Sequence, residues 1–125
     1  MPVHLGLTAK TTLEVTADDT AVAARSGDVP VLSTPRIVAL CEETTIAAVA
    51  GHLAEGETTV GMRIQLDHLA PSAVGSTVTA SAKLEKVEGR RLKFSVSVSD
   101  ARGLIAAGKV TRVVVERERF MEKCL

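Results

Sequence analysis

The chain opens with a short segment in which apolar and polar positions alternate. Within residues 3–16, Leu13 and Val15 alternate with the polar residues Thr12 and Glu14. A period of two is typical of a strand that buries one face. We therefore expect the first strand of the domain within this segment.

A long helical pattern follows from Pro35 to about Leu53, mostly apolar and polar only in patches. Ser33 and Thr34 are both residue types that cap free backbone amides, and proline suits the first helical position because its missing N–H has no partner there. Gly56 stands beyond the run as a stop signal. The pattern predicts one long helix that is buried on most sides.

The remainder of the chain predicts four strands in a meander, at residues 58–70, 76–88, 91–101 and 104–120, with Gly, Pro and Ser turn signals between them. In the two middle segments the apolar residues share one face; they are Val78, Ala80, Ala82 and Leu84, then Leu92, Phe94, Val96 and Val98. One strand, one helix and four strands predict a single α+β domain over residues 1–125. Its curved antiparallel sheet wraps around the helix, which is the hotdog layout.

Residues 17–33, between the first strand and the helix, mix Asp, Gly, Ser and Pro with small apolar residues. This composition favours a loop lying over another part of the molecule, so we expect a lid rather than a regular element.

The amino-acid composition argues against one class of partner and favours a homodimer. Fifteen basic residues balance fifteen acidic ones and the only aromatic residues are two Phe, which argues against a nucleic-acid partner. Apolar residues make up 46% of the chain, and most of them are Ala and Val, whose small side chains each bury little area. We therefore expect a homodimer in which a second copy covers one face.

Cys41 and Cys124 lie far apart and show no spacing typical of zinc or redox motifs, so we expect reduced thiols and neither metal nor cofactor. No run approaches the roughly 18 apolar residues of a membrane span, and the first residues do not resemble a signal peptide. The sequence predicts a soluble cytoplasmic protein without a membrane partner.

Three residues are candidates for chemistry. Glu42 and Glu43 interrupt the apolar helix, and because adjacent helical residues point about 100° apart, one of them should face the packed side. They are either solvated or arginine-paired carboxylates, or one is a partly buried base or nucleophile. His68 lies near a strand end, where its side chain can reach a site, although a single histidine is more often structural. Serine-hydrolase, zinc-protease and nucleotide-binding motifs do not occur.

Two segments, TPRIVALCE at 34–42 and GMRIQLDHLAPSAVGSTVTASAKLEKVEGRRLKFSVSVSD at 61–100, resemble the fluoroacetyl-CoA thioesterase family of hotdog proteins. The resemblance covers roughly residues 30 to 120. It implies an enzyme that hydrolyses a small acyl-CoA thioester to a carboxylic acid and coenzyme A.

The resemblance also implies the site residues. Thr34, Glu42 and His68 match the catalytic positions, and Gly61 matches a backbone donor to the thioester oxygen. Their expected roles are general acid-base catalysis for His68, orientation of His68 or attack or activation of water for Glu42, and nucleophilic attack or acyl positioning for Thr34.

Arg90 and Arg91 in the EGRR turn are candidates for binding coenzyme A phosphates, and equally for ordinary turn charges. Eight residues of helix rise about 12 Å, so Thr34 and Glu42 cannot touch along a straight helix. A bend or a partner chain must join them, which is a further reason to expect the site at a subunit boundary.

The resemblance implies that fluoroacetyl-selective members of the family have aromatic side chains around a lid. This chain has no aromatic residue before Phe94. We therefore expect a more open or aliphatic acyl site. A non-catalytic acyl-CoA-binding module and a hydratase on the same fold are the alternatives. The sequence does not specify which acyl group is preferred or whether the thiol carrier is coenzyme A or a carrier protein. It also does not distinguish a dimer from a tetramer.

Overall fold

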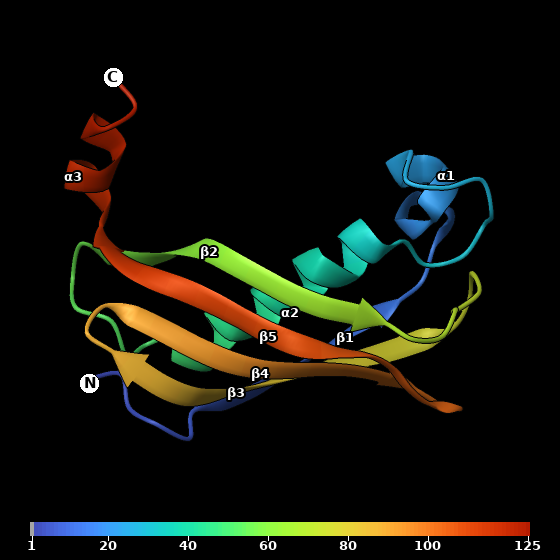
Figure 1. Ribbon diagram of the computed structural model, residues 1–125, viewed down its shortest axis with the longest axis horizontal. Coiled ribbons are helices and arrows are strands. Elements are labelled where there is room, and N and C mark those ends of the chain that lie inside the picture. Colours follow the sequence, from blue (N-terminus) through green and yellow to red (C-terminus); the bar gives the residue numbers. More distant parts are fainter. Residues whose placement is uncertain (1) are drawn as a thin grey trace.

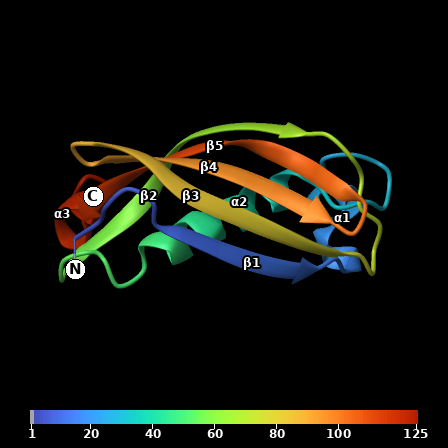
Figure 2. The ribbon, with the colours of Figure 1, turned by 90° about the horizontal axis from the view of Figure 1, so that it is seen from below.

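The computed structural model describes residues 2–125, and its core is a five-stranded antiparallel sheet wrapped around one helix (Figures 1 and 2). The strand order in the sheet is β1-β3-β4-β5-β2. The bounds are β1 Thr8–Glu14, β2 Glu57–His68, β3 Thr77–Glu88, β4 Arg91–Asp100 and β5 Gly103–Glu116. The predicted α+β class and curved sheet are confirmed.

Helix α2, Thr34–Val49, lies across the concave face of the sheet and packs mainly against β1 and β3. The alternating apolar residues predicted for the two middle strands all lie in the core that faces this helix, together with Ile37 and Leu40 of α2. The concave face is therefore dry, as the period-two pattern requires.

The predicted helix bounds need two corrections. Ser33 is the cap, since its hydroxyl accepts a bond from the Arg36 amide, and the helix begins at Thr34 rather than Pro35. The helix ends at Val49 and not near Leu53, because Ala50 leaves the helical region and Gly51 takes a φ of 81° that favours glycine.

The predicted meander is correct only for β3, β4 and β5. Strand β2 pairs with β5 and not with β3, so it forms one edge of the sheet. At Gly108 the backbone of β2 approaches so closely that a side chain would overlap the carbonyl of Gln65. The last predicted strand is also too long. Glu116 accepts a bond from the Arg119 amide and begins the short helix α3, Arg117–Glu122.

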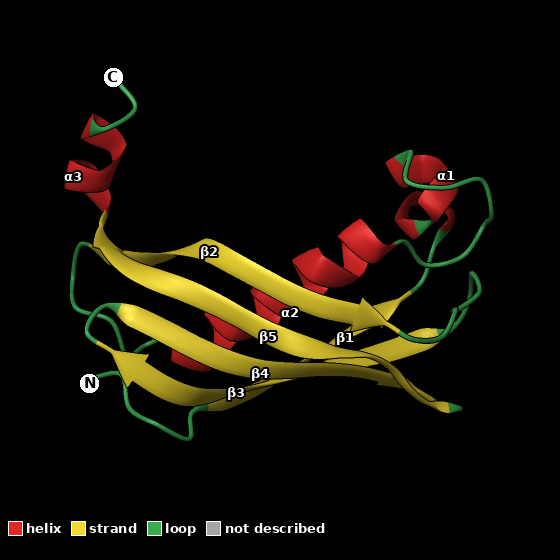
Figure 3. Cartoon of the chain, viewed as in Figure 1, coloured by secondary structure: helices red, strands yellow, loops and turns green. Residues whose placement is uncertain are grey.

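Residues 17–33, expected as an irregular lid, contain two short elements, the 3-10 helix η1 at Ala17–Asp19 and helix α1 at Ala21–Ala24 (Figure 3). Backbone bonds from Ser33 to Asp19 and from Leu32 to Ser72 tie the segment to its surroundings. Figure 1 shows this segment at one end of the sheet and α3 at the other. None of the described helices has the length and apolar character that a membrane crossing needs.

Candidate active site

The first part of the site lies where α2 begins and β2 ends. The cap at Ser33 fixes the first turn of α2, so the exposed side chain of Thr34 points towards the last residue of β2. The Thr34 hydroxyl and His68 Nδ1 are 2.8 Å apart, a hydrogen bond whose donor depends on the histidine tautomer. The other ring nitrogen, Nε2, is buried without a partner among the described residues. Two residues predicted for the site therefore meet.

The second part lies halfway along α2, where Glu42 faces the middle of β2. Its Oε2 accepts a bond of 3.1 Å from Arg112 Nη1 on β5. The same oxygen occupies the space that a side chain at Gly61 would fill. A side chain at Gly61 would therefore displace the carboxylate from this position, and these two predicted residues also meet.

The two adjacent glutamates of α2 point in different directions, as their helical spacing predicts. Glu43 is exposed and pairs with Arg36 at 3.2 Å, whereas the Glu42 side chain is 31% exposed and turned towards the sheet. The alternative that both carboxylates pair with arginine is confirmed. For Glu42 the arginine is buried and lies inside the site.

Arg112 was not identified as a site residue from the sequence. Its side chain is only 5% exposed, and it donates to the Thr59 hydroxyl at 2.9 Å and the Thr59 carbonyl at 3.0 Å as well as to Glu42. Burial lowers the pKa of the Arg112 guanidinium below its usual value, and the Glu42 carboxylate counteracts part of that effect. The available signal was an arginine within the apolar run VTRVVV, where a charged residue needs a partner.

The strand that carries Gly61 and His68 is interrupted next to Gly61. Gly61 pairs with Arg112 and Arg63 with Thr111, so Met62 is an extra residue that forms a β-bulge. Bulges locally disrupt the ladder of backbone bonds and are frequent next to active sites. This bulge lies between the two parts of the site.

Within one chain the two parts stay separate. Helix α2 is one continuous element from Thr34 to Val49, so Glu42 lies about 12 Å along it from Thr34. No hydrogen bond joins Glu42 to Thr34 or His68 within residues 2–125. The chain therefore brings the four residues together as two pairs.

The turn arginines lie away from both pairs. Arg90 donates to Glu57 at 3.4 Å and to the Val114 carbonyl at 3.3 Å, at the end of β2 opposite His68. Arg91, at the start of β4, is exposed. Within residues 2–125 no hydrogen bond joins either arginine to Thr34, Glu42 or His68.

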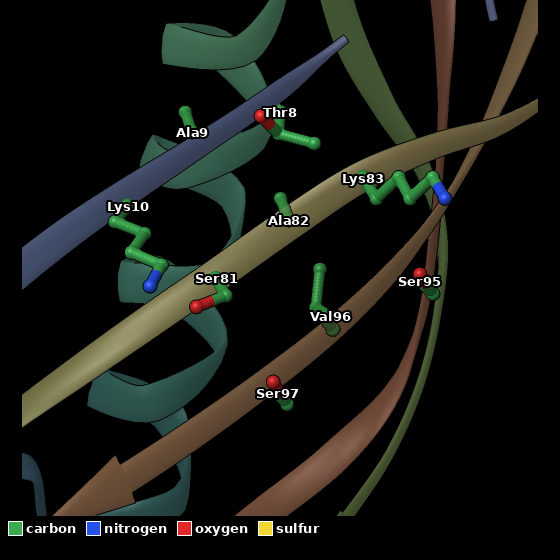
Figure 4. A pocket seen from close by; sticks show the side chains of 9 residues that line it. All are labelled: Thr8, Ala9, Lys10, Ser81, Ala82, Lys83, Ser95, Val96 and Ser97. Carbon is green, nitrogen blue, oxygen red and sulfur yellow. The ribbon is translucent and has the colours of Figure 1, made fainter. Parts of the chain in front are cut away.

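Two cavities lie away from these residues. One, of about 560 Å³, is on the outer face of the sheet and is lined by hydroxyl, lysine and small apolar side chains of β1, β3 and β4 (Figure 4). The other, of about 550 Å³, lies at the open end of the sheet near His52 and Arg90. Thr34, Glu42, Gly61 and His68 line neither cavity.

Cys41 precedes Glu42 but is not a candidate nucleophile. Its thiol is buried in the core, and burial, with a smaller effect of the Glu42 charge, raises its pKa to about 11. A nucleophilic cysteine needs the thiolate form. Cys41 is therefore a small core residue that stays protonated near neutral pH.

The lid segment is joined to α2 by a charged contact. Arg36 Nε donates to Asp19 at 3.1 Å, and the Asp19 side chain is 12% exposed. The backbone amide of Thr16 lowers the pKa of the Asp19 carboxyl most, and the Thr16 hydroxyl and Arg36 lower it further. This contact fixes the lid next to the start of α2.

Comparison with known proteins gives matches to one family of thioesterases. The family model described as fluoroacetyl-CoA-specific thioesterase matches residues 15–118. The fluoroacetyl-CoA thioesterase of Streptantibioticus cattleyicolor is 39% identical over 93 residues, which cover 74% of this chain and 67% of that protein.

Solved structures of related proteins have the same fold. A fluoroacetyl-CoA thioesterase structure is 30% identical, with a TM-score of 0.93 over 99% of this chain and 96% of that chain. A hot-dog-like protein from Thermanaerovibrio acidaminovorans is 28% identical, with a TM-score of 0.89 over 96% and 89% of the two chains. The protein therefore belongs to the fluoroacetyl-CoA-specific thioesterase family and is a thioester hydrolase of the hotdog fold.

Proposed function

We propose that this protein hydrolyses small acyl-CoA thioesters to a carboxylic acid and coenzyme A, with Thr34, Glu42 and His68 as catalytic residues. The observation that carries the proposal is the 2.8 Å hydrogen bond between the Thr34 hydroxyl and His68 Nδ1. A hydroxyl bonded to an imidazole is the arrangement that activates a weak oxygen nucleophile. In a family of thioesterases, this pair is the best candidate for the groups that carry out thioester hydrolysis.

The roles follow from what each group can do. His68 takes a proton from the attacking oxygen and returns it to the departing thiolate of coenzyme A. The Gly61 amide, next to the bulge, donates to the oxyanion that develops on the thioester carbonyl. Two routes fit these groups: attack by the Thr34 oxygen to form an acyl-enzyme that water hydrolyses, or direct attack by a water that Glu42 activates.

We further propose that the active enzyme is a homodimer in which Thr34 and His68 of one chain meet Glu42 and Gly61 of the partner. A continuous helix holds Thr34 and Glu42 about 12 Å apart, so one substrate carbonyl cannot contact both within a chain. Strand β2 is an unpaired sheet edge of 12 residues, and such an edge favours pairing with a second copy.

The exposed apolar residues support this interface. Met62 on β2 and Ile46 on α2 are 49% and 48% exposed, and Ile46 lies one turn from Glu42. A second copy that covered them would bury apolar surface and exclude water from the site.

For the acyl group, we propose a small aliphatic chain rather than selective recognition of fluoroacetate. The lid carries the exposed residues Val22 and Val29 and no aromatic side chain. A lid of this kind offers apolar contact without a bulky gate. Among relatives, a fluoroacetyl-CoA thioesterase variant has been solved with fluoroacetate and CoA.

The remaining substrate contacts and the location are also proposals. We propose that Arg90 and Arg91 bind coenzyme A phosphates, because guanidinium groups match phosphate oxygens and Arg91 is exposed. We place the enzyme in the cytoplasm, since Cys41 and Cys124 are both free thiols, as is usual in a reducing compartment.

The test is thiol release from a panel of short, branched and aryl acyl-CoAs by wild type, Glu42→Gln and Glu43→Gln. Glu43→Gln is the matched control, because it removes the neighbouring exposed carboxylate. We expect release by wild type and by Glu43→Gln, and about a 1000-fold lower rate for Glu42→Gln. Binding of acyl-CoA without any thiol release by folded wild type would contradict the proposal and indicate a non-catalytic module.

A further inference from the structure

The cavity on the outer face of the sheet, called the outer cavity below, takes no part in the proposed chemistry. It measures about 560 Å³ and lies over β1, β3 and β4, on the side away from α2 (Figure 4). Its polar lining residues are two lysines and four hydroxyl residues: Thr8, Lys10, Ser81, Lys83, Ser95 and Ser97. Its lining contains no carboxylate. The outer cavity thus combines hydrogen-bond donors with enough space for a small ligand.

The strand register explains why this part of the sheet is hollow. Lys10 on β1 lies opposite Ser81 on β3, and Ser81 lies opposite Ser97 on β4. In the next row Lys83 lies opposite Ser95 and is the diagonal neighbour of Lys10, at a Cα distance of about 7 Å. Figure 4 shows the two long lysine side chains with the short serine side chains beside them. Serines between lysines leave the space open.

The two lysines of the outer cavity lack ion pairs, unlike their neighbours along the same strands. Lys86 and Lys93 both pair with Glu88, at 3.9 Å and 2.7 Å. No carboxylate of residues 2–125 lies within ion-pair distance of Lys10 or Lys83. Opposite charges across strands stabilise a sheet, and the chain uses them at Glu88 but not here. The two ammonium groups are therefore available to an anionic ligand.

The surroundings of the outer cavity keep an excess of positive charge. Lys109 on β5 lies opposite Ser95 and is a third lysine without an ion pair in the described part of the chain. One carboxylate is adjacent, that of Glu85, which accepts a hydrogen bond from the Ser95 hydroxyl at 2.9 Å. Three lysines and one carboxylate leave two positive charges in excess. The hydroxyls of Ser81 and Ser97 make no hydrogen bond to any described residue.

These features select among anionic partners. A second copy of the chain packed on this face would bring lysines against lysines, which repel each other. The lining contains no aromatic side chain, so a nucleobase would find no surface for stacking. A compact anion with more than one phosphate group matches two diagonal ammonium groups with hydroxyl donors beside them.

We infer that the outer cavity binds a small polyphosphate anion. Lys10 and Lys83 each bind one phosphate group, and the hydroxyls of Ser81 and Ser97 donate hydrogen bonds to the oxygens between them. Helix α2, with the proposed catalytic residues that it carries, lies on the other face of the sheet. The outer cavity is therefore a second ligand site, and the inference does not rest on the proposed hydrolysis.

The experiment is calorimetric titration of inorganic pyrophosphate into wild type, Lys10→Gln/Lys83→Gln and Lys86→Gln/Lys93→Gln. The last variant is the matched control, because it also removes two positive charges from β-strand lysines of the same sheet. We expect saturable binding to wild type and to the control, and at least about 30-fold weaker binding to Lys10→Gln/Lys83→Gln. All these lysines are exposed, so both variants should fold. No saturable binding to wild type, or equal weakening in both variants, would indicate an adventitious ion only and overturn the site.

Two further measurements sharpen the assignment. Ser81→Ala/Ser97→Ala should weaken pyrophosphate binding about fivefold, and unchanged affinity would overturn the role of the hydroxyls. Coenzyme A carries the same pyrophosphate chemistry, so its displacement of pyrophosphate would identify coenzyme A as the source of the anion. Pyrophosphate binding that persists in excess coenzyme A would identify a free polyphosphate instead. Wild type that binds pyrophosphate without releasing thiol from any acyl-CoA would overturn the proposed function alone.

Discussion

The two parts of the site are built in opposite ways. The Thr34–His68 pair is a single hydrogen bond between the exposed start of α2 and the end of β2. The Glu42–Gly61 pair is a charged contact held by a buried arginine with three acceptors. The first part is open to substrate and held by few contacts, whereas the second is fixed by the core of the sheet.

This difference in construction suits the two parts to different roles, proton transfer in the first and orientation of a charge in the second. A group that takes part in proton transfer must reach the reacting atoms, and the exposed Thr34 side chain bonded to His68 meets that need. A group that orients charge must be preorganised, and the Arg112 fork on β5 meets that need for Glu42. Substitutions in the first part should therefore change rate with little effect on folding, while those in the second should affect both.

The largest effect is expected at His68. His68→Asn should lower kcat about 1000-fold, because it removes the group that moves the proton. His52→Asn is the matched control, since His52 also has a buried ring nitrogen without a partner among the described residues but lies away from the site. Steady-state thiol release measures both variants. Equal losses in the two variants would contradict the role of His68.

Thr34 and Ser33 provide a comparison between adjacent hydroxyls. Thr34→Val should lower kcat about 100-fold with little change in stability, because its hydroxyl bonds to His68. Ser33→Ala should lower the free energy of unfolding by about 1 kcal/mol through loss of the cap. Kinetics and urea unfolding separate the two effects. A Thr34→Val enzyme that is fully active but unstable would reduce Thr34 to a structural residue.

Gly61→Ala tests the crowding at Glu42. The added methyl would overlap Oε2 and move the carboxylate, so kcat should fall about tenfold. The second substitution Glu42→Asp shortens the side chain and should recover part of the loss caused by Gly61→Ala. If Glu42→Asp deepens the loss instead, the overlap is not the cause, and thiol release by the single and double variants decides between the two outcomes.

The smallest effect is expected at Asp19, in the lid contact. Its carboxyl has a lowered pKa, so the stability that it contributes is present above its unfolded pKa of about 4 and is lost as the pH falls through the lower folded value. Asp19→Asn should cost about 1 kcal/mol at neutral pH and weaken the loss of stability below pH 4. Urea unfolding between pH 2.5 and 7 measures this. An unchanged pH dependence would show that Asp19 does not contribute.

The sequence was sufficient for the elements whose pattern is local. Alternation in β3 and β4 and the cap before α2 follow from period and residue type, and both are confirmed. The separation of β2 from β3 was not predictable in this way, because strand order depends on contacts distant in the chain. The α3 helix was missed because its residues continue the charged end of a strand pattern.

For the site, helical spacing alone predicted that Glu42 and Glu43 diverge. Resemblance to the family pointed to Thr34, Gly61 and His68, whose contacts then joined them in pairs. Arg112 was missed because its partner on α2 lies 70 residues away in the chain. Only the fold brings that arginine and Glu42 together.

The central claim is that two chains complete each site, and mixing inactive variants tests it most directly. Thr34→Ala/His68→Ala and Glu42→Gln are each purified, confirmed as folded, then unfolded together and refolded in equal amounts. Half of randomly paired dimers contain one chain of each kind, and one of their two sites has every group, so about a quarter of wild-type thiol release should return. A mixture no more active than its two components would contradict the shared site and confine the chemistry to a single chain.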